Sequence, residues 1–533
     1  MDAKRGTRHL TVGASIAMGA ALATPGSAQA ATLTVTNLDD EGAGSLRDAI
    51  FDANHNGPGS DDILFASGLS GTIDVGSTLD SPLVPATAMI INGGGQITLH
   101  AADSGSGYLM STRSAFYLGS QPGDTITLSG LTLTGGHTVG DGGGIFNREA
   151  NLVLSDVVVS GNHAGDDGGG IYSREGSLTL VDSTVKGNTA GDEAHDRASG
   201  GAIFSEDAPV AIRSSTISGN SSGGDGGGIF MSPAYARQPS LTIENSTIAD
   251  NASTAHSNYD EGGGVWICCG GGGQRLDIRS STISGNSVGG ALGAGGGVYA
   301  YVAYTYDAVS RITIQDTILA NNSGTRGNDL FLWNGGEVRS SLVEDPSNSA
   351  NPPATVTFTG NNILGLDPQL GPLADNGGPT QTEAPASNSP AIDAGSSPGL
   401  SSDQRGVQRP IDFPVIPNAA GEDGADIGAF ELQPDNRIKL GKLKRNPARG
   451  TAKQIVKVPM PSAGTLTIAG KGLKTKTRNV ADTGKVKLPV IPKGKKRAQE
   501  NATGRVKLRA KITYTPTGNA NKTLKRKLKL RKR

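Results

Sequence analysis

One eleven-residue phrase occurs seven times between residues 126 and 322, and its repetition constrains the fold more than any other feature of the chain. The copies are ITLSGLTLTGG, LVLSDVVVSGN, LTLVDSTVKGN, VAIRSSTISGN, LTIENSTIADN, LDIRSSTISGN and ITIQDTILANN. From one last residue to the next, the copies are separated by 26, 26, 32, 31, 35 and 36 residues. Repeats of this length with variable spacers are typical of stacked supersecondary units. The phrase therefore predicts a solenoid.

Each copy has the periodicity of a strand, interrupted by a bend. In LTIENSTIADN, Leu241 and Ile243 flank polar Thr242, and Ile248 resumes the pattern after an offset that a straight strand cannot accommodate. A second phrase, of the Gly-Gly-Gly-Ile type, lies between successive copies and adds a third strand. Three short strands per turn predict an all-β fold, a right-handed parallel β-helix whose coils stack at about 4.8 Å.

Three columns of equivalent residues follow from stacking the copies. Two apolar columns are expected inside, because no single coil can bury its own face. They are Leu152, Leu178, Val210, Leu241, Leu276 and Ile312, and Val159, Val185, Ile217, Ile248, Ile283 and Leu319. The third column ends each phrase and comprises Asn162, Asn188, Asn220, Asn251, Asn286 and Asn322. We interpret it as a structural ladder, since stacked amides can hydrogen-bond along the stack and Asn tolerates the left-handed backbone of a sharp bend.

Charge divides the 533-residue chain into two unlike parts. Residues 437–533 hold 30 Lys and Arg against Asp482 and Glu500, whereas the rest of the chain holds 18 basic and 47 acidic residues. In GRVKLRAKITY, apolar residues alternate with cations, which predicts strands with one apolar and one cationic face. This stretch resembles the lysine-rich Ig-like tail domains of some secreted bacterial proteins. We therefore expect an acidic rod followed by a small basic β-sandwich.

The first 30 residues have the pattern of a secretory signal: early basic residues, an apolar and small-residue stretch, and Ala28-Gln29-Ala30. No segment has 18 consecutive apolar residues, so no membrane span is expected. The prediction is a secreted or cell-surface monomer. The expected divisions are 1–30 signal peptide, 31–110 N-terminal cap and irregular coils, 111–345 repeats, 346–436 C-terminal cap and 437–533 basic tail domain.

The segment after the signal is expected to cover the open end of the stack, whose edge would otherwise invite aggregation. Ser45-Leu46-Arg47-Asp48 forms a capping box, and a short helix would place Leu46, Ala49, Ile50 and Ala53 on one face. This stretch resembles the CSLREA segment found at the start of many secreted bacterial β-helix proteins. Gly44 stands where that family has Cys, and Asp48 where it has Glu.

Several spaced blocks between residues 360 and 432 resemble the choice-of-anchor Q domain, which closes β-helical surface proteins. The blocks are DNGGPT at 375, PAID at 390, DQRG at 403 and DIGAFE at 426. Their Pro, Gly and Asn content is typical of turns and suits a C-terminal cap. We expect Asp403-Gln404-Arg405 and Arg409-Pro410 to lie in this cap, away from the stacked coils.

An acidic column precedes the glycine triplets and is the main candidate for a metal site. It comprises Asp141, Asp167, Asp225 and Glu261. Carboxylates stacked about 4.8 Å apart repel, and Ca²⁺ would relieve the repulsion. The alternative is ordinary turn chemistry with solvated side chains. No other cofactor is expected.

Two further pairs of side chains are candidate ligands. His137 and His163 occupy equivalent positions on neighbouring coils and could take a divalent metal, but no third strong ligand repeats with them. The two cysteines are adjacent, Cys268 and Cys269, and are either free thiols or a vicinal disulfide.

Aromatic residues gather after the glycine phrase of the late coils, where the loops also lengthen. They are Tyr235, Trp266, Tyr299, Tyr301, Tyr304 and Tyr306. On one wall of the rod, these rings could stack on sugars. The alternative is packing among the loops themselves.

The pattern favours a cell-surface or extracellular-matrix protein with a structural, adhesive or glycan-binding role and no catalytic residues. Its expected partners are polysaccharides and anionic envelope polymers that bind the basic tail, with nucleic acid only outside the cell. The alternative, by fold analogy alone, is a polysaccharide lyase or glycoside hydrolase. A lyase needs a Ca²⁺ or Arg clamp and a base, and a hydrolase needs two facing carboxylates; neither set is evident outside the repeated columns.

Overall fold

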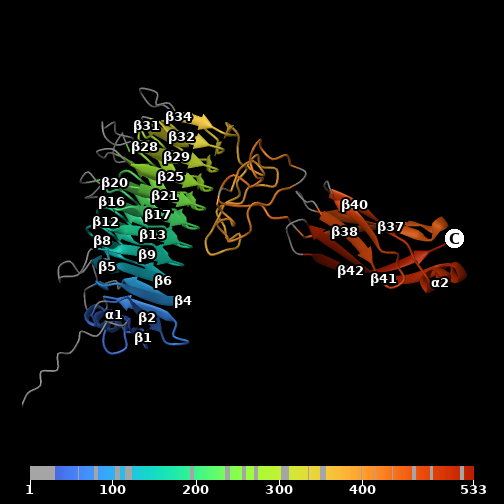
Figure 1. The fold of residues 1–533 in the computed structure, drawn as a ribbon, viewed down its shortest axis with the longest axis horizontal. Helices are drawn as coiled ribbons and strands as arrows, with labels where there is room; N and C mark the ends of the chain where they lie inside the picture. Colours follow the sequence, from blue (N-terminus) through green and yellow to red (C-terminus); the bar gives the residue numbers. More distant parts are fainter. Residues whose placement is uncertain are drawn as a thin grey trace, which may run out of the picture.

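The computed structural model describes residues 30–533 apart from short segments at 58, 77–81, 102–108, 114–122, 193–196, 234–239, 255–259, 269–273, 302–310, 334, 348–355, 398, 414–415, 435, 459–463, 481–483 and 517–520. The predicted signal peptide therefore lies outside the described residues, except for Ala30. Figure 1 shows a solenoid of stacked parallel strands, a loop-rich segment along one side of it, and a separate β domain at the C-terminus.

The solenoid is a parallel β-helix with three sheets, and the phrase that repeats in the sequence builds the largest. This first sheet contains β1 (Thr32–Val35), β2 (Asp61–Phe65), β3 (Gly71–Val75), β4 (Met89–Ala101), β6 (Thr125–Thr134), β9 (Asn151–Ser155), β10 (Val158–Ser160), β13 (Ser177–Val181), β14 (Thr184–Lys186), β17 (Val210–Arg213), β18 (Thr216–Ser218), β21 (Ser240–Glu244), β22 (Thr247–Ala249), β25 (Arg275–Arg279), β26 (Thr282–Ser284), β29 (Arg311–Gln315), β30 (Ile318–Ala320), β32 (Gly336–Arg339), β33 (Leu342–Val343), β34 (Val356–Thr359) and β35 (Ile363–Leu364).

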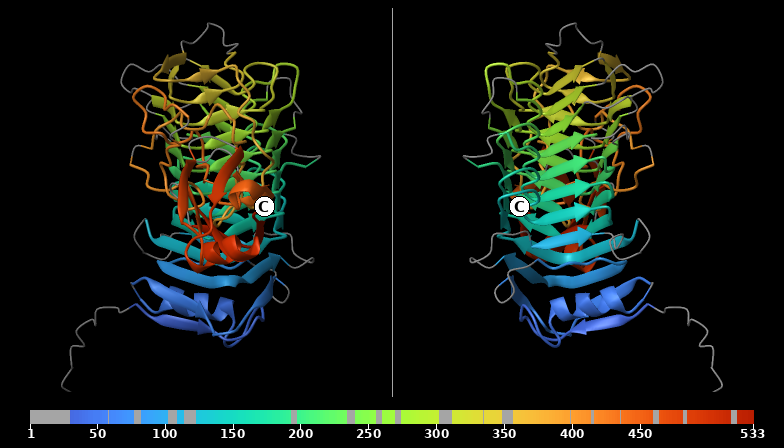
Figure 2. Two further views of the ribbon diagram at one scale, coloured as in Figure 1. Left: turned by 90° about the vertical axis from the view of Figure 1, so that its right-hand side faces the viewer. Right: turned by 90° about the vertical axis from the view of Figure 1, so that its left-hand side faces the viewer.

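The other two sheets complete each coil (Figure 2). The six Gly-Gly-Gly-Ile-type phrases form β8 (Ile145–Arg148), β12 (Ile171–Arg174), β16 (Ile203–Glu206), β20 (Ile229–Ser232), β24 (Val265–Ile267) and β28 (Val298–Tyr301) of the second sheet, which also contains β5 (Met110–Arg113) and β31 (Leu330–Trp333). The third has two-residue strands that follow the Gly-Asn corner and was not foreseen: β7 (His137–Thr138), β11 (His163–Ala164), β15 (Thr189–Ala190), β19 (Ser221–Ser222), β23 (Ala252–Ser253) and β27 (Ser287–Val288).

Both predicted apolar columns are buried and in register, which confirms the stacking. Leu178 pairs with Leu152 and Val210, and Ile217 pairs with Val185 and Ile248. The bend between the two strands of each phrase is made by one residue in the left-handed region, such as Asn245 at φ 55°. Glycine in the first copy, Gly130, and small polar residues in the other six occupy this position, because they tolerate a positive φ better than bulky side chains.

The asparagine column forms the predicted ladder. Each side-chain amide donates to the Oδ1 of the next Asn along the stack, at 2.8–2.9 Å between Asn162 and Asn322. The same Oδ1 accepts the backbone N–H of the preceding ladder residue, as Asn251 does from Asn220 at 3.1 Å. The conformational part of the prediction was wrong, because the left-handed residue is the one before each Asn, for example Gly219 at φ 61°.

A second polar ladder is formed by the residue directly after the left-handed bend residue, and the sequence analysis missed it. Ser215 illustrates the pattern: its hydroxyl donates to the Arg213 carbonyl at 2.7 Å and accepts the Ser183 backbone N–H at 3.0 Å. The members are Ser183, Ser215, Ser246, Ser281, Thr317 and Ser341. Buried backbone donors at the bend are thereby satisfied by short side chains.

The N-terminal helix α1 (Leu46–His55) lies beside β1 and β2 at one end of the solenoid (Figure 1). Ser45 caps it by accepting the Asp48 N–H at 3.2 Å, and Asp48 Oδ2 accepts the Gly44 N–H at 3.2 Å. Its buried residues are Leu46, Ala49, Ile50 and Ala53, and they join the core cluster of the coils. The predicted capping helix is confirmed with all four of its apolar residues.

The segment expected to cap the other end folds back along the flank of the solenoid instead. We call residues 366–432 the flank segment. Gln404 accepts from Thr247 Oγ1 at 2.6 Å and donates to the Ser215 carbonyl at 3.2 Å. Thr380 donates to the Ser214 carbonyl at 3.0 Å. The expectation that Asp403-Gln404-Arg405 and Arg409-Pro410 lie away from the stack is wrong for Gln404, which bonds to Thr247 and Ser215, and for Arg409, whose Nη1 lies 3.5 Å from Asn245 Oδ1. Asp403 and Arg405 bond to each other and to Glu431 within the flank segment.

A buried charge network holds the flank segment together. Arg409 pairs with Glu431 at 3.0 Å, and both side chains are fully buried. Arg405 pairs with Asp403 at 2.6 Å and stacks on Phe430 at 3.4 Å from the ring centroid. Residues of the DQRG and DIGAFE blocks, which carry the resemblance to the choice-of-anchor Q domain, therefore lie close together and stabilise this loop-rich segment.

The tail domain is a small antiparallel β-sandwich, as predicted. One sheet contains β36 (Lys439–Asn446), β37 (Thr451–Val458) and β40 (Gly484–Val490); the other contains β39 (Lys476–Val480), β38 (Gly464–Ala469), β41 (Arg505–Pro516) and β42 (Lys522–Arg531). The 3₁₀ turn η2 (Pro447–Arg449) and helix α2 (Lys495–Thr503) complete it. Apolar residues of both sheets pack into one core around Tyr514, and no helix among the described residues is long and apolar enough to cross a membrane.

We expect Ile217→Asp to destabilise the solenoid by about 4 kcal/mol, because it places an unpaired charge among buried side chains. Thr179→Asp is the control, since Thr179 points outward between Leu178 and Leu180 and is only half-buried. Thermal and urea unfolding of both variants measure the difference. A soluble Ile217→Asp protein with the same melting temperature as the wild type would contradict the register.

We expect Asn251→Ala to cost about 2–4 kcal/mol, because it orphans several buried groups at once. The Asn220 backbone N–H and side-chain amide lose their acceptor, and the Ile217 carbonyl loses its donor. Ser160→Ala, at a half-buried position of another coil, is the control. Equal unfolding curves for the two variants would show that the ladder contributes no stability.

Candidate functional site

The acidic column links successive coils through their backbones. Asp141 Oδ1 accepts the Asp167 N–H at 3.2 Å, Asp167 Oδ1 accepts the Ser199 N–H at 2.7 Å, and Asp225 Oδ1 accepts the Glu261 N–H at 2.7 Å. Each member precedes a left-handed glycine, such as Gly226 at φ 64°. The turn chemistry of the alternative agrees with these glycines, whereas its fully solvated side chains do not, because all four carboxylates are partly buried and three accept a hydrogen bond from the next coil.

Burial governs the protonation of this column. It raises the pKa of Asp167 and of Asp225 to about 7 in each case, with neighbouring carboxylates adding to the rise and the backbone hydrogen bonds opposing it. Burial also raises the pKa of Asp141 and Glu261. Among the residues that the structure describes, no group of three His, Cys, Asp or Glu side chains is placed to hold a metal ion. Calcium binding stays a prediction without support from the donor geometry.

A column of stacked aromatic rings lies beside these carboxylates, on the outer face of the second sheet. Neighbouring centroids are 4.1–6.2 Å apart and the ring planes agree within 11°. The members are Phe146, Tyr172, Phe204, Phe230, Trp266, Tyr299 and Phe331. Trp266 Nε1 donates to Glu261 at 3.2 Å and the Tyr172 hydroxyl donates to Glu206 at 3.1 Å. The polar atoms of these rings are therefore tied to carboxylates.

Two described residues of the predicted sugar-binding wall, Trp266 and Tyr299, belong to this column, and their rings are not open to a sugar. Trp266 exposes 6 % of its surface and Tyr299 exposes 5 %. Tyr301 is half-buried and its ring lies 5.8 Å from that of Trp333. Tyr235, Tyr304 and Tyr306 lie outside the described residues. Packing, the alternative, accounts for Trp266 and Tyr299, although their partners are the rings of adjacent coils rather than loops.

The histidine and cysteine pairs show packing and bonding of their own. The rings of His137 and His163 lie 4.6 Å apart at 35°, and burial lowers the pKa of His163, with His137 adding to the effect. Cys268 is disulfide-bonded, whereas Cys269 lies outside the described residues.

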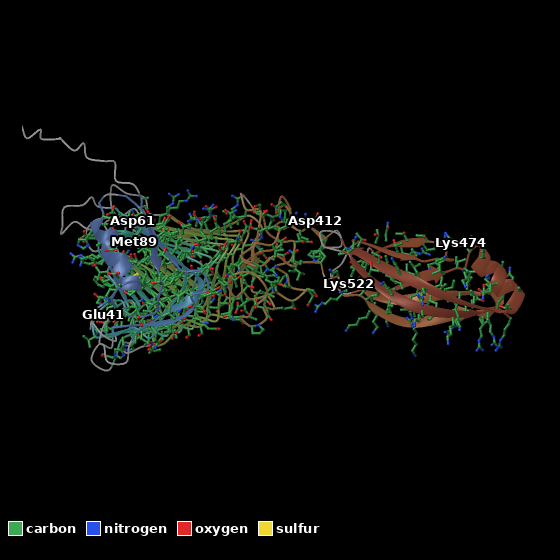
Figure 3. The ribbon with its side chains drawn as sticks, turned by 90° about the horizontal axis from the view of Figure 1, so that it is seen from below. Glu41, Asp61, Met89, Asp412, Lys474 and Lys522 are labelled. Atoms are coloured by element: carbon green, nitrogen blue, oxygen red, sulfur yellow. The ribbon has the colours of Figure 1, made fainter. Side chains whose placement is uncertain are left out.

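A cationic ladder lies on one sheet of the tail domain. It consists of four cross-strand pairs of β41 with β42: Arg505–Arg531, Lys507–Lys529, Arg509–Lys527 and Lys511–Lys525. All eight side chains are exposed, because they alternate with buried residues such as Leu508 and Leu528. Figure 3 shows nitrogen-tipped side chains projecting from this domain, with Lys474 and Lys522 among them.

Two grooves run over the ladder and widen the cationic surface. One has a volume of about 510 Å³ and is lined by Lys471 and Lys496 in addition to ladder residues. The other, of about 570 Å³, shares Lys471, Arg509 and Lys527 with the first. The only described acidic residue of the domain, Glu500, is buried and pairs with Arg497 at 2.7 Å. Among the described residues of the domain, no acidic side chain is therefore paired with the ladder.

Comparison with known proteins supports the fold and assigns no activity. Residues 121–305 match the family model described as the right-handed β-helix region. Together with the parallel sheets, this match confirms the predicted right-handed parallel β-helix. No curated protein matches the chain.

We expect Asp225→Asn to stabilise the solenoid more at pH 8 than at pH 5. The folded pKa of Asp225 is raised to about 7, so its contribution to stability is full below the unfolded value of 3.8 and is lost as the pH rises through about 7. Asn keeps the acceptor for the Glu261 N–H and removes the charge. Melting temperatures from pH 5 to 8 test this, and an identical pH dependence in wild type and variant would contradict it.

Proposed function

We propose that this protein is an exported, non-catalytic β-helix rod that acts as a structural or adhesive component of the cell surface or extracellular matrix. In this proposal the basic tail domain holds it to anionic envelope polymers. The observation that carries the proposal is the cationic ladder, eight exposed Lys and Arg side chains on one face of two adjacent strands. Such a surface attracts polyanions within a screening distance of about 8 Å at physiological ionic strength.

In this proposal the solenoid acts as a rigid spacer. Its titratable and aromatic columns are bonded to neighbouring coils, so they contribute rigidity to the rod. The excess of acidic residues outside the tail would repel the rod from a negatively charged envelope and hold it outward. The proposal of export rests on the sequence pattern of residues 1–30. The proposal also includes glycans that bind the rod itself. No observation favours the lyase or hydrolase alternative.

Deleting residues 437–533 is expected to abolish retention of the protein on purified cell envelopes. The full chain should be retained at about 0.05 M salt and released progressively toward about 0.5 M, because screening weakens charge attraction. A pull-down across this salt series compares the two proteins, with the melting temperature of the solenoid as the folding control. If the truncated chain is retained as firmly as the full chain, the tail is not the anchor.

A further inference from the structure

The cationic ladder has a geometry that selects among polyanions, and the inference drawn from it rests on the proposed function. Equivalent positions along one strand recur every second residue, about 6.6–6.8 Å apart, and side chains opposite each other across the pair have Cβ atoms about 4.5–5.5 Å apart. The four pairs therefore form a double row of cations about 20 Å long. A linear anion lying between the rows would meet two cations at each step.

The position of the charges argues for a binding role rather than general solubility. Like charges directly opposite on neighbouring strands are destabilising, and here all four pairs are like-charged. Beyond the ladder the same face of the sheet is neutral: Thr467 bonds to Thr477 at 2.9 Å, and Thr513 bonds to Thr523 at 2.8 Å. Cations spread over the whole face would solubilise the domain at a lower cost in repulsion. On this face the cations are concentrated in one strip instead, and the opposite sheet carries its own like-charged pairs, such as Lys457–Lys485.

The pairing of cations favours phosphodiesters over carboxylates. A phosphodiester carries two non-bridging oxygens that point in different directions, so each can accept from one row of the ladder. A carboxylate places both oxygens in one plane on one carbon, which suits a single Arg fork. In a polyol phosphate, one phosphate per short repeat provides a charge at each step of the double row.

Nucleic acid fits this surface less well, although it is also a phosphodiester. Proteins that hold single strands combine a basic groove with aromatic side chains on which the bases stack. The tail sequence from residue 437 to residue 533 contains one aromatic residue, Tyr514, and it is fully buried. Bases would find no stacking partner there.

From these observations we infer that the β41–β42 ladder is a binding site for a linear polyol-phosphate polymer of the teichoic type. The chain of the polymer runs along the strands, and successive phosphates lie between successive cation pairs. Lys471 and Lys496 extend the site at the rim of the adjoining groove. Affinity then depends on where the cations lie, and not only on how many the domain has.

Two variants of the full chain with the same change in net charge test this. The ladder variant is Lys507→Gln, Arg509→Gln, Lys527→Gln and Lys529→Gln, which empties the two central pairs. The control variant is Lys453→Gln, Lys457→Gln, Lys485→Gln and Lys487→Gln, which removes four exposed cations from the opposite sheet. Binding to defined polyglycerol phosphate is measured at several salt concentrations. Polyuronate and single-stranded DNA of matched charge serve as comparison ligands.

The ladder variant should lose about tenfold or more in affinity for polyglycerol phosphate and show a shallower salt dependence, whereas the control variant should lose less than about threefold. The ladder variant should melt at or above the wild-type temperature, because it relieves like-charge pairs, and this verifies that it is folded. Equal losses in the two variants would overturn the inference. So would wild-type binding to polyuronate or DNA as tight as to polyglycerol phosphate.

The outcomes separate this inference from the proposed function. If deletion of the tail abolishes envelope retention while the two variants behave alike, the tail is the anchor and its charge acts without a defined site. If the truncated chain stays bound to envelopes, the proposed function fails whatever the ladder binds.

Discussion

Hydrogen bonding from one coil to the next is the constraint on which the rest of this molecule depends. In a parallel β-helix no coil satisfies its own backbone groups, so every strand needs the coil on either side. The corners are the weak points, because the chain leaves the sheet there. Asn side chains satisfy one corner, Ser and Thr hydroxyls a second, and carboxylates such as Asp225 a third. Polar residues whose pattern in the sequence suggests a functional site therefore form hydrogen bonds between neighbouring coils.

This explains which features the sequence could predict. Periodicity reveals whatever repeats with the coil, so the buried columns of Leu152 and Ile217 and the Asn ladder were predictable from the residues alone. The Ser ladder repeats as well, but its hydroxyls lie where the strand pattern is interrupted, so periodicity alone does not reveal their role. The aromatic column was also visible, as the residue after each Gly-Gly-Gly-Ile core. The exposure of these rings could not be predicted, because a ring on the outer face of a strand can be open to solvent or covered.

The flank segment could not be placed by the same reasoning. Gln404 contacts Thr247, 157 residues earlier, and no local pattern records a contact at that separation. Yet the result has a plain physical cause. Outward-facing Thr216, Thr247 and Thr282 offer hydroxyls in register along the flank, and the turn-rich segment supplies carbonyl, amide and N–H partners for them. Covering this face buries side chains that remain partly exposed on earlier coils, such as Thr184.

The two domains handle charge in opposite ways, and this contrast points to the tail as the surface that acts on other molecules. In the solenoid and flank segment, buried charges are neutralised or hydrogen-bonded: Arg409 meets Glu431, and Asp167 accepts a backbone N–H. On the tail, cations face cations across β41 and β42, and the only described acid of that domain is buried. Folding alone gives no reason to accept that repulsion, because alternating signs would pair favourably at the same positions. A polyanion from outside the chain would supply the missing charge.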